Sequence, residues 1–246
     1  MPTRSILLIT AVLVLMALSG QTQGKLQTDI LKTSGGDLQI TCIRHATLMF
    51  AYAGKVIHID PISIYADYST LPKADLILIT HEHIDHLDPK AIRAISKAAT
   101  AVIVNPGASK ALPDATVVKN GETKTVAGVK IEAVPAYNSY HPKGNGNGYV
   151  LTFGDKRVYV AGDTENIPEL KALKDIDVAF LPMSLPFTMS PEQVADLAKA
   201  IHPKVLYPYH TRETNAAVLT NLLKDEQAIE VRIRDMGTAA PKSSAR

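Results

Sequence analysis

Four potential metal ligands lie within a six-residue stretch, directly after a short apolar run. The run covers residues 76–79, and the ligands that follow it are His81, His83, Asp85 and His86. An apolar run of this length is typical of a buried strand. Alternate side chains of an extended chain share a face, so His81, His83 and Asp85 would point one way. A turn would then bring His86 beside Asp85.

This combination of ligand atoms is suited to transition metals. Imidazole binds zinc, iron or nickel, and a carboxylate adds a harder oxygen ligand. The stretch therefore predicts a metal site at the end of a strand. A solvated loop that happens to be rich in histidine is the less favoured interpretation.

Composition is that of an ordinary globular chain. The 246 residues are 46% hydrophobic and 20% charged, enough for one large domain or two small ones. The net charge is +2 and no basic block is present, so composition gives no reason to expect a nucleic-acid partner. A single cysteine, Cys42, excludes an internal disulfide, and its apolar surroundings predict a buried side chain.

The N-terminal residues 1–24 have the pattern of a secretory signal peptide. Arg4 provides the positive start, an apolar run extends from Ser5 to Ser19, and small residues such as Gly20 and Gly24 follow. The run is short for a membrane span, which needs about 20 apolar residues. We therefore expect an exported protein, periplasmic or secreted, without stable membrane insertion after cleavage. An uncleaved anchor is the alternative.

Strands alternate with helices along the rest of the chain. Three strands are expected over residues 38–60, and further strands at 76–79, 101–104, 117–118, 129–134, 149–153, 157–160, 177–181, 204–209 and 229–233. Helices are expected after Pro89, with Asp88 as N-cap, and after Pro191, with a capping box. A final helix would carry Val218, Leu219, Leu222 and Leu223. This alternation of strands and helices predicts a fold built of α and β layers. Residues 25–237 would form the domain, and residues 238–246 a disordered tail.

Several side chains and one loop carry more specific expectations. The first helix would bury Ala91, Ile92, Ile95 and Ala98 on one face, and the glycine-rich residues 144–148 would form a flexible loop. His58 and His202 are each expected to be a structural histidine. Three further side chains, Met183, Phe187 and Met189, are expected in the core.

Other polar candidates follow later strands. Asp60 ends a strand before a proline, and a simple Asp-Pro turn explains it equally well. Asn138 and His141 follow another strand. Asp163 stands in Gly-Asp-Thr, which in isolation is equally typical of a turn. His210 closes the strand at 204–209.

The histidine motif resembles the signature of the metallo-β-lactamase fold superfamily. The segments Pro-Ala-Tyr-Asn, Gly-Asp-Thr and Pro-Tyr-His follow it in the family's order, and the resemblance covers about residues 38–237. It implies an α/β fold, an αββα sandwich of two mixed sheets with helices on the outer faces. Within the superfamily the chain resembles the small stand-alone hydrolases that include ascorbate-6-phosphate lactonase.

The resemblance also implies a ligand set for two divalent metal ions, zinc first, with manganese, iron or nickel as alternatives. One ion would take His81, His83 and His141. The other would take Asp85, His86 and His210, and Asp163 would bridge. Asn138 competes with His141 for the third position, and otherwise supports the site together with Asp60 and His45. Asp85 and His210 are the catalytic candidates. Tyr140, Lys143 and Arg212 are candidate substrate contacts, and solvated surface groups are the favoured interpretation of these three.

The implied activity is that of an exported hydrolase acting on a small-molecule substrate, an ester, lactone or related bond. A hydroxide shared by two cations about 3.5–4 Å apart would attack that bond. Phosphodiester cleavage of a phospholipid or nucleotide, β-lactamase activity and a non-catalytic metal-binding envelope protein are the alternatives. Zinc β-lactamases have a cysteine or no bridging acid where Asp163 stands, which disfavours the β-lactamase. The sequence leaves the oligomeric state open.

Overall fold

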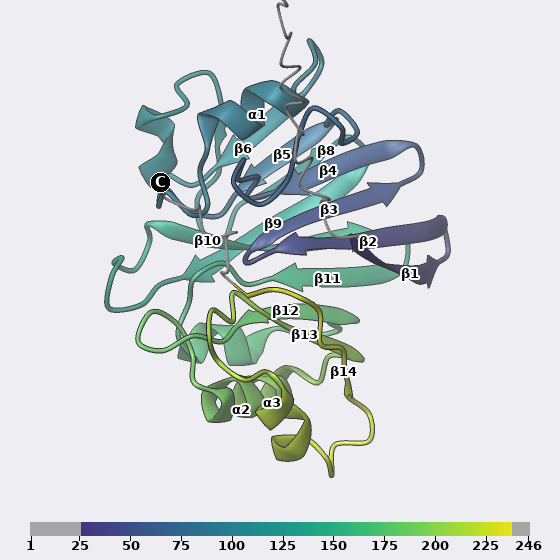
Figure 1. Ribbon diagram of the computed structural model, residues 1–246, viewed down its shortest axis with the longest axis vertical. Coiled ribbons are helices and arrows are strands. Elements are labelled where there is room, and N and C mark those ends of the chain that lie inside the picture. Colours follow the sequence, from purple (N-terminus) through teal and green to yellow (C-terminus); the bar gives the residue numbers. More distant parts are fainter. Residues whose placement is uncertain (1–25, 238–246) are drawn as a thin grey trace, which may run out of the picture.

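The computed structural model of the chain describes residues 26–237. The expected signal peptide (1–24) and C-terminal tail (238–246) lie outside these residues. Two seven-stranded sheets pack face to face, with helices on the two outer sides (Figure 1). The predicted α/β sandwich is therefore confirmed. No helix among residues 26–237 has the length and hydropathy of a membrane span.

The first sheet holds the strands of the N-terminal half in chain order. Its strands are β1 (Gln27–Thr33), β2 (Gly36–Arg44), β3 (Thr47–Tyr52), β4 (Lys55–Ile59), β5 (Leu76–Ile79), β6 (Ala101–Val104) and β7 (Thr116–Val117). Pairing is antiparallel from β1 to β4 and parallel from β4 to β7.

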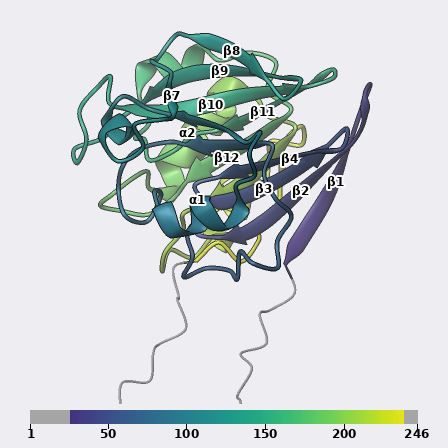
Figure 2. The same cartoon turned by 90° about the horizontal axis from the view of Figure 1, so that it is seen from above.

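The second sheet repeats this scheme with the C-terminal half. Its strands are β8 (Thr123–Val126), β9 (Val129–Ala136), β10 (Gly146–Phe153), β11 (Lys156–Val160), β12 (Val178–Pro182), β13 (Val205–Tyr209) and β14 (Glu230–Val231). Pairing is antiparallel from β8 to β11 and parallel from β11 to β14. Seen from above, the strands of the two halves lie over one another (Figure 2).

Alternation along the strands produces three apolar layers. In β5, Leu76 and Leu78 face the core between the sheets, while Ile77 and Ile79 face the outer layer beneath α1 (Pro89–Ile95). β12 does the same towards the layer beneath α2 (Pro191–Ile201). A two-residue period places successive side chains on opposite faces, so both strands are buried on both sides. Cys42 lies in the central layer, as expected, and burial raises the pKa of its thiol to about 12.

The helices begin where the cap residues predict. The Asp88 side chain accepts from the Lys90 amide, and Ser190 and Gln193 form the capping box of α2. The first helix, however, ends at Ile95, because Ser96 is extended and its hydroxyl donates to the Ile92 carbonyl. The expected position of Ala98 on the buried face is therefore wrong, and Ala98 is exposed.

Two further expectations are corrected. β10 already begins at Gly146, inside the expected flexible loop, because Gly146 to Thr152 pair with β9. The last strand has only two residues, since only Val205 and Leu206 of β13 pair with it. The expected final helix is α3 (Ala217–Leu222), which holds Val218, Leu219 and Leu222 and has Leu223 as its C-cap. Two short 3-10 helices, η1 (Gly107–Lys110) and η2 (Pro168–Ala172), complete the elements.

Candidate metal centre

The candidate residues lie on connections that leave both sheets. His45 follows β2, the histidine motif follows β5, His141 lies between β9 and β10, Asp163 follows β11, and His210 follows β13. The carboxyl ends of neighbouring parallel strands meet at one edge of a sheet, which is where α/β folds place their sites. Asn147 of β10 donates its amide to the Thr80 carbonyl and so ties the two sheets together at this edge.

The first group consists of His81, His83 and His141. One nitrogen of each lies within 4.8 Å of the others. The Nε2 atom of His81 is 3.1 Å from Nδ1 of His83, and the ring of His141 stacks on His81 with 4.8 Å between centroids. Both ring nitrogens of His141 are buried and have no hydrogen-bond partner among the described residues. A metal ion is the kind of partner that such nitrogens fit.

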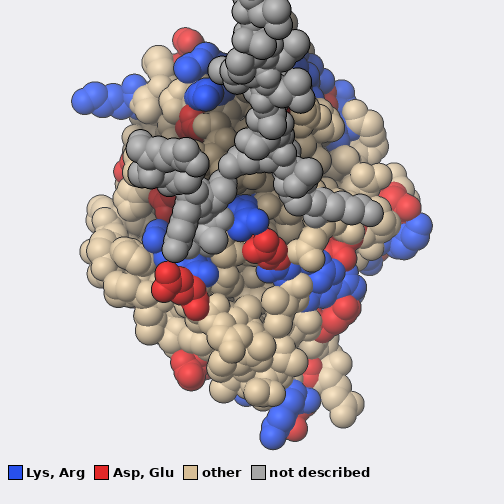
Figure 3. Space-filling view, viewed as in Figure 1, with Lys and Arg blue, Asp and Glu red and all other residues tan. Residues whose placement is uncertain are grey.

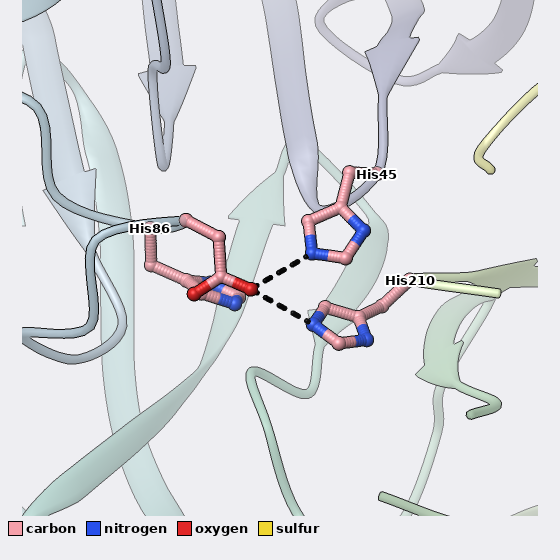
Figure 4. A group of neighbouring side chains, drawn as sticks. His45, His86 and His210 are labelled. Carbon is pink, nitrogen blue, oxygen red and sulfur yellow. Dashed lines mark hydrogen bonds and ion pairs between the residues drawn. The ribbon is translucent and has the colours of Figure 1, made fainter. Parts of the chain in front are cut away.

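The second group consists of His45, Asp85, His86 and His210, again within 4.8 Å of one another. Figure 4 shows the three imidazoles converging, with dashed lines from His45 and His210 to the carboxylate of Asp85. The Nε2 atom of His45 is 3.2 Å from Oδ2 of Asp85, and the ring of His45 lies over His210 at 3.8 Å between centroids.

Asp163 lies between the two groups. Its Oδ1 is 3.3 Å from Nε2 of His86, and its Oδ2 is 3.2 Å from Nε2 of His210 and 3.9 Å from Nε2 of His81. Within residues 26–237, the Oδ1 atom of Asp163 and the Nε2 atoms of His86 and His210 nevertheless lack a well-oriented hydrogen bond. Buried polar atoms that face one another without bonding fit a cation placed between them.

The turn before Asp163 depends on glycine. Gly162 has φ +67°, and a Cβ there would lie 2.9 Å from the Asn147 carbonyl. Only glycine readily adopts this conformation. The Gly-Asp-Thr turn therefore lets the chain pass close to β10 while directing Asp163 towards the histidines.

Asp60 and Thr80 fix the orientation of His86. Asp60 is fully buried and accepts hydrogen bonds from the Thr80 amide at 2.8 Å and the Thr80 hydroxyl at 2.6 Å. Its Oδ2 is also 2.7 Å from Nδ1 of His86. A carboxylate at Nδ1 assigns the proton to that nitrogen and leaves the Nε2 lone pair directed at Asp163. Asp60 is therefore more than a turn residue.

The structure places His141, and not Asn138, beside His81 and His83. Asn138 instead holds the loop that carries His141: its Oδ1 accepts from the His141 and Tyr140 amides, at 3.1 and 2.7 Å. Its Nδ2 donates to the carbonyls of Asp163 and Phe187. Asn138 thus connects His141 to the strand end that carries Asp163.

Comparison with known proteins identifies the family of the chain. The family model for β-lactamase superfamily domains matches residues 39–210. The chain belongs to the β-lactamase superfamily. It is 33% identical over 191 residues to a UPF0173 metal-dependent hydrolase of Pyrobaculum neutrophilum, covering 70% of this chain and 84% of the relative. A second relative of the same description, from Methanoculleus marisnigri, is 32% identical over 208 residues, covering 78% and 89%.

Solved structures of other proteins share the fold. A protein of Parabacteroides distasonis, provisionally named a metal-dependent hydrolase, has a TM-score of 0.84 at 53% identity, covering 86% of this chain and 99% of that one. CmlA, a diiron β-hydroxylase of Streptomyces venezuelae, has a TM-score of 0.66 at 18% identity, covering 82% and 53%. The likeness to CmlA concerns the fold alone. One fold therefore carries different chemistries, and the site must decide the function. The likeness to ascorbate-6-phosphate lactonase stays a prediction.

Electrostatics divides the histidines of this superfamily member into two sets. Burial lowers the pKa of His81 far below its ordinary value and also lowers the pKa of His141. Burial would do the same to His86 and His210, but the charge of Asp163 outweighs it and raises the pKa of both. Metal binding requires neutral imidazoles, so protons and metal ions compete for the second set.

Both carboxylates of the site are held ionised. Burial alone would raise the pKa of Asp163, but the charges of His210 and His86 lower it far below the usual range. Burial likewise opposes ionisation of Asp85, and the contacts from His210 and His45 overcome it and lower the pKa of that carboxyl. An ionised carboxylate is the form that binds a cation.

A cavity of about 180 Å³ opens over Asp85 and Asp163. It is lined by His83, Asp85, Asn138, Tyr140, Asp163, Phe187 and Arg212. The expectation that Phe187 is a core residue is wrong, because its ring lies under the Arg212 guanidinium at 4.4 Å. Met183 and Met189 are buried as expected. Lys143 pairs with Glu169 and does not line the cavity.

Two side chains that support the site were not predicted from the sequence. Glu82, within the histidine motif, accepts from Asn105 at 2.9 Å and from Asn145 at 2.6 Å, which ties the motif to the loop after His141. The Ser184 hydroxyl lies 2.9 Å from Nδ1 of His210. Ser184 follows the end of β12, at the same sheet edge as the ligands, and that position is the signal that could have found it. His58, by contrast, is a buried structural histidine as expected, bonded to the Pro72 carbonyl.

Proposed function

We propose that this metal-dependent hydrolase of the β-lactamase superfamily uses two divalent metal ions to cleave a small ester or lactone. The observation that carries the proposal is the position of Asp163, with one carboxylate between two groups of buried imidazoles. One group offers His81, His83 and His141, and the other offers Asp85, His86 and His210. A carboxylate between two such groups can bridge two cations and offset part of their mutual repulsion.

The chain's own groups would orient the reaction. When bound, two metal ions would supply a water of lowered pKa and polarise the bond that is attacked. Asp85 lines the cavity and carries an ionised carboxylate, so it is placed to accept a proton from that water. His45 and Arg212 hold the Asp85 oxygen at 3.2 and 3.1 Å, and Ser184 orients His210.

Hydrolysis of a lactone at this site would add one water to the acyl carbon. The acyl carbon–oxygen bond breaks, the ring oxygen takes one proton of the water and leaves as a hydroxyl, and the acyl carbon becomes a carboxylate with release of the other proton. That proton is the one that Asp85 would receive.

The substrate would be small. The cavity of about 180 Å³ lies below the range of roughly 300–1,000 Å³ typical of drug-sized ligand pockets. On the face seen in Figure 3, basic and acidic side chains of the described residues are interspersed and form no broad patch of one sign. Both observations favour a small molecule over a polyanion such as nucleic acid.

Metal analysis followed by a substrate panel tests this function. Purified mature protein should hold two metal ions per chain after reconstitution with zinc or manganese, and should hydrolyse members of a lactone and carboxylic-ester panel. The variant His202→Gln, which alters an exposed histidine at the end of α2, is the control and should retain both metals. A content near zero or one ion contradicts the dinuclear site. Turnover confined to phosphodiesters or β-lactams would replace the proposed substrate class, and two ions without any turnover would favour a metal-binding protein.

We also propose that the protein is exported, on the pattern of residues 1–24. N-terminal sequencing of the protein recovered from the cell envelope or medium should find a start between Gly20 and Lys25. A chain that begins at Met1 or Pro2 would contradict cleavage.

A further inference from the structure

Arg212 is the one cation among the residues that line the cavity. It comes two residues after His210, and its backbone is left-handed with φ 47°. Residues other than glycine rarely adopt this conformation, and those that do are concentrated at functional sites. The turn after β13 therefore presents a metal-ligand candidate and a guanidinium to the same space.

One face of the guanidinium packs on the Phe187 ring, and one of its N–H groups donates to Asp85. Its central carbon lies 4.4 Å from the centre of the Phe187 ring, and its Nη2 donates to Oδ2 of Asp85 at 3.1 Å. Its Nε atom is buried and has no acceptor among residues 26–237. A guanidinium has five N–H donors in a planar fork, and here the contact with Asp85 uses one.

Asp85 is a poor permanent partner for this charge. The same Oδ2 atom that receives Arg212 is 3.2 Å from His45 and 3.8 Å from His210. In the proposed dinuclear site Asp85 also shares its charge with a divalent ion. The cavity then contains a cation whose charge is only partly compensated and whose side chain is about one third exposed.

We propose that Arg212 binds a carboxylate of the substrate, so that the enzyme acts on small lactones or esters that bear an acidic group near the scissile bond. This inference rests on the proposed hydrolase function. The planar fork of arginine matches a carboxylate through two parallel hydrogen bonds. Tyr140 and Phe187, with ring centres 5.2 Å apart, form the apolar wall beside it.

A matched pair of lactones tests the assignment. The γ-lactone of 2-hydroxyglutarate carries a carboxylate beside the ring oxygen, and γ-valerolactone carries a methyl group there. The metal-loaded wild type should prefer the acidic lactone in kcat/KM. Arg212→Gln should reduce kcat/KM for the acidic lactone about 10²-fold more than kcat/KM for γ-valerolactone, because the charge-assisted bidentate contact serves only the acidic lactone, whereas loss of the contact with Asp85 affects both.

Lys143→Gln is the charge-matched control. Lys143 lies on the neighbouring loop but pairs with Glu169 outside the cavity. Its loss should leave the preference for the acidic lactone unchanged. An equal loss of both lactones in Arg212→Gln, with a fall in metal content, would mean that Arg212 acts only by holding Asp85, and would overturn the assignment.

Calorimetry with the ring-opened compounds separates this inference from the hydrolase function. The metal-loaded wild type should bind 2-hydroxyglutarate at least tenfold more tightly than 4-hydroxypentanoate, and Arg212→Gln should abolish the difference. If neither lactone is hydrolysed but this difference is found, the catalytic proposal for lactones fails and the carboxylate site stands. Equal binding of the two compounds by the wild type would overturn the carboxylate site whatever the turnover.

Discussion

Asp163 connects the two histidine groups through one side chain, so its charge can be tested in isolation. Asp163→Asn keeps the size of the side chain and removes the negative charge. Without that charge, two cations would repel each other more strongly, and the second should bind more weakly. We expect turnover of a panel substrate to fall by about 10²-fold or more, the scale at which loss of an electrostatic stabiliser is felt.

The fold should tolerate the same change. The three apolar layers lie in the sheets and helices and do not include Asp163. The circular-dichroism spectrum of Asp163→Asn should therefore match that of the wild type. A variant that binds two metal ions and turns over at the wild-type rate would reduce Asp163 to a turn residue.

His58 offers a test of pH-dependent stability away from the metal centre. Burial lowers the pKa of His58 to about 4, whereas an exposed histidine titrates near 6.5. Between these values the unfolded chain binds the extra proton, so stability is complete above about pH 6.5 and falls as the pH approaches 4. A shift of this size corresponds to about 3 kcal/mol.

The variant His58→Gln isolates this contribution. Urea unfolding of metal-free protein at about pH 4.5 and about pH 7 should show a smaller loss of stability on acidification in the variant than in the wild type. The other histidines titrate in both proteins, so the difference between them reports on His58. Equal pH dependence in the two proteins would show that this imidazole is not held neutral by the fold.

At the scale of elements, the prediction from sequence succeeds where the signal is local. The continuous apolar runs of β5 and β12 and the caps Asp88 and Ser190 are local properties of the sequence, and the structure confirms these elements. The start of β10 and the length of β14 were missed because a partner strand far along the chain decides them. Local periodicity does not contain that information.

The residues of the candidate site likewise divide into those that a local sequence signal predicted and those that depend on distant partners. The histidine motif was found because its four ligands lie within six residues of the chain, and the later candidates because they follow strands in the family's order. Phe187, Glu82 and Ser184 escaped because their roles depend on Arg212, Asn145 and His210, which are 25, 63 and 26 residues away in sequence. No spacing rule joins such pairs before the fold is known.

The loop between β9 and β10 yields a paired prediction. His141→Ala removes two buried nitrogens that face His81 and His83, so it should lose one metal ion per chain. Asn138→Ala removes hydrogen bonds that hold the loop but no nitrogen of this group. It should therefore retain both ions and bind them about 10–100-fold more weakly, the usual cost of losing a supporting partner. Titration with a chelating indicator measures both, and the opposite ranking would move the ligand assignment to Asn138.

At the scale of the whole molecule, metal removal should lower thermal stability. Ions that bind the folded chain and not the unfolded one stabilise it by about 2.7 kcal/mol each at a hundredfold excess over Kd. For a domain of this size each kcal/mol moves Tm by about 2–4 °C. Scanning calorimetry should therefore show a melting temperature lower by several degrees in chelator, restored by zinc or manganese. An unchanged Tm would indicate that the buried imidazoles are satisfied without a cation.

The division of the chain into two sheets has a consequence for how the site can be assembled. Strands β1 to β7 and β8 to β14 form separate sheets, and the turn around Gly121 joins them. His81 and His83 come from one half, while His141 and Asp163 come from the other. A chain severed at that turn would give two fragments, each with a complete sheet and neither with a complete ligand set. Metal binding by a mixture of the two fragments, at a level that neither fragment reaches alone, would therefore report that they assemble.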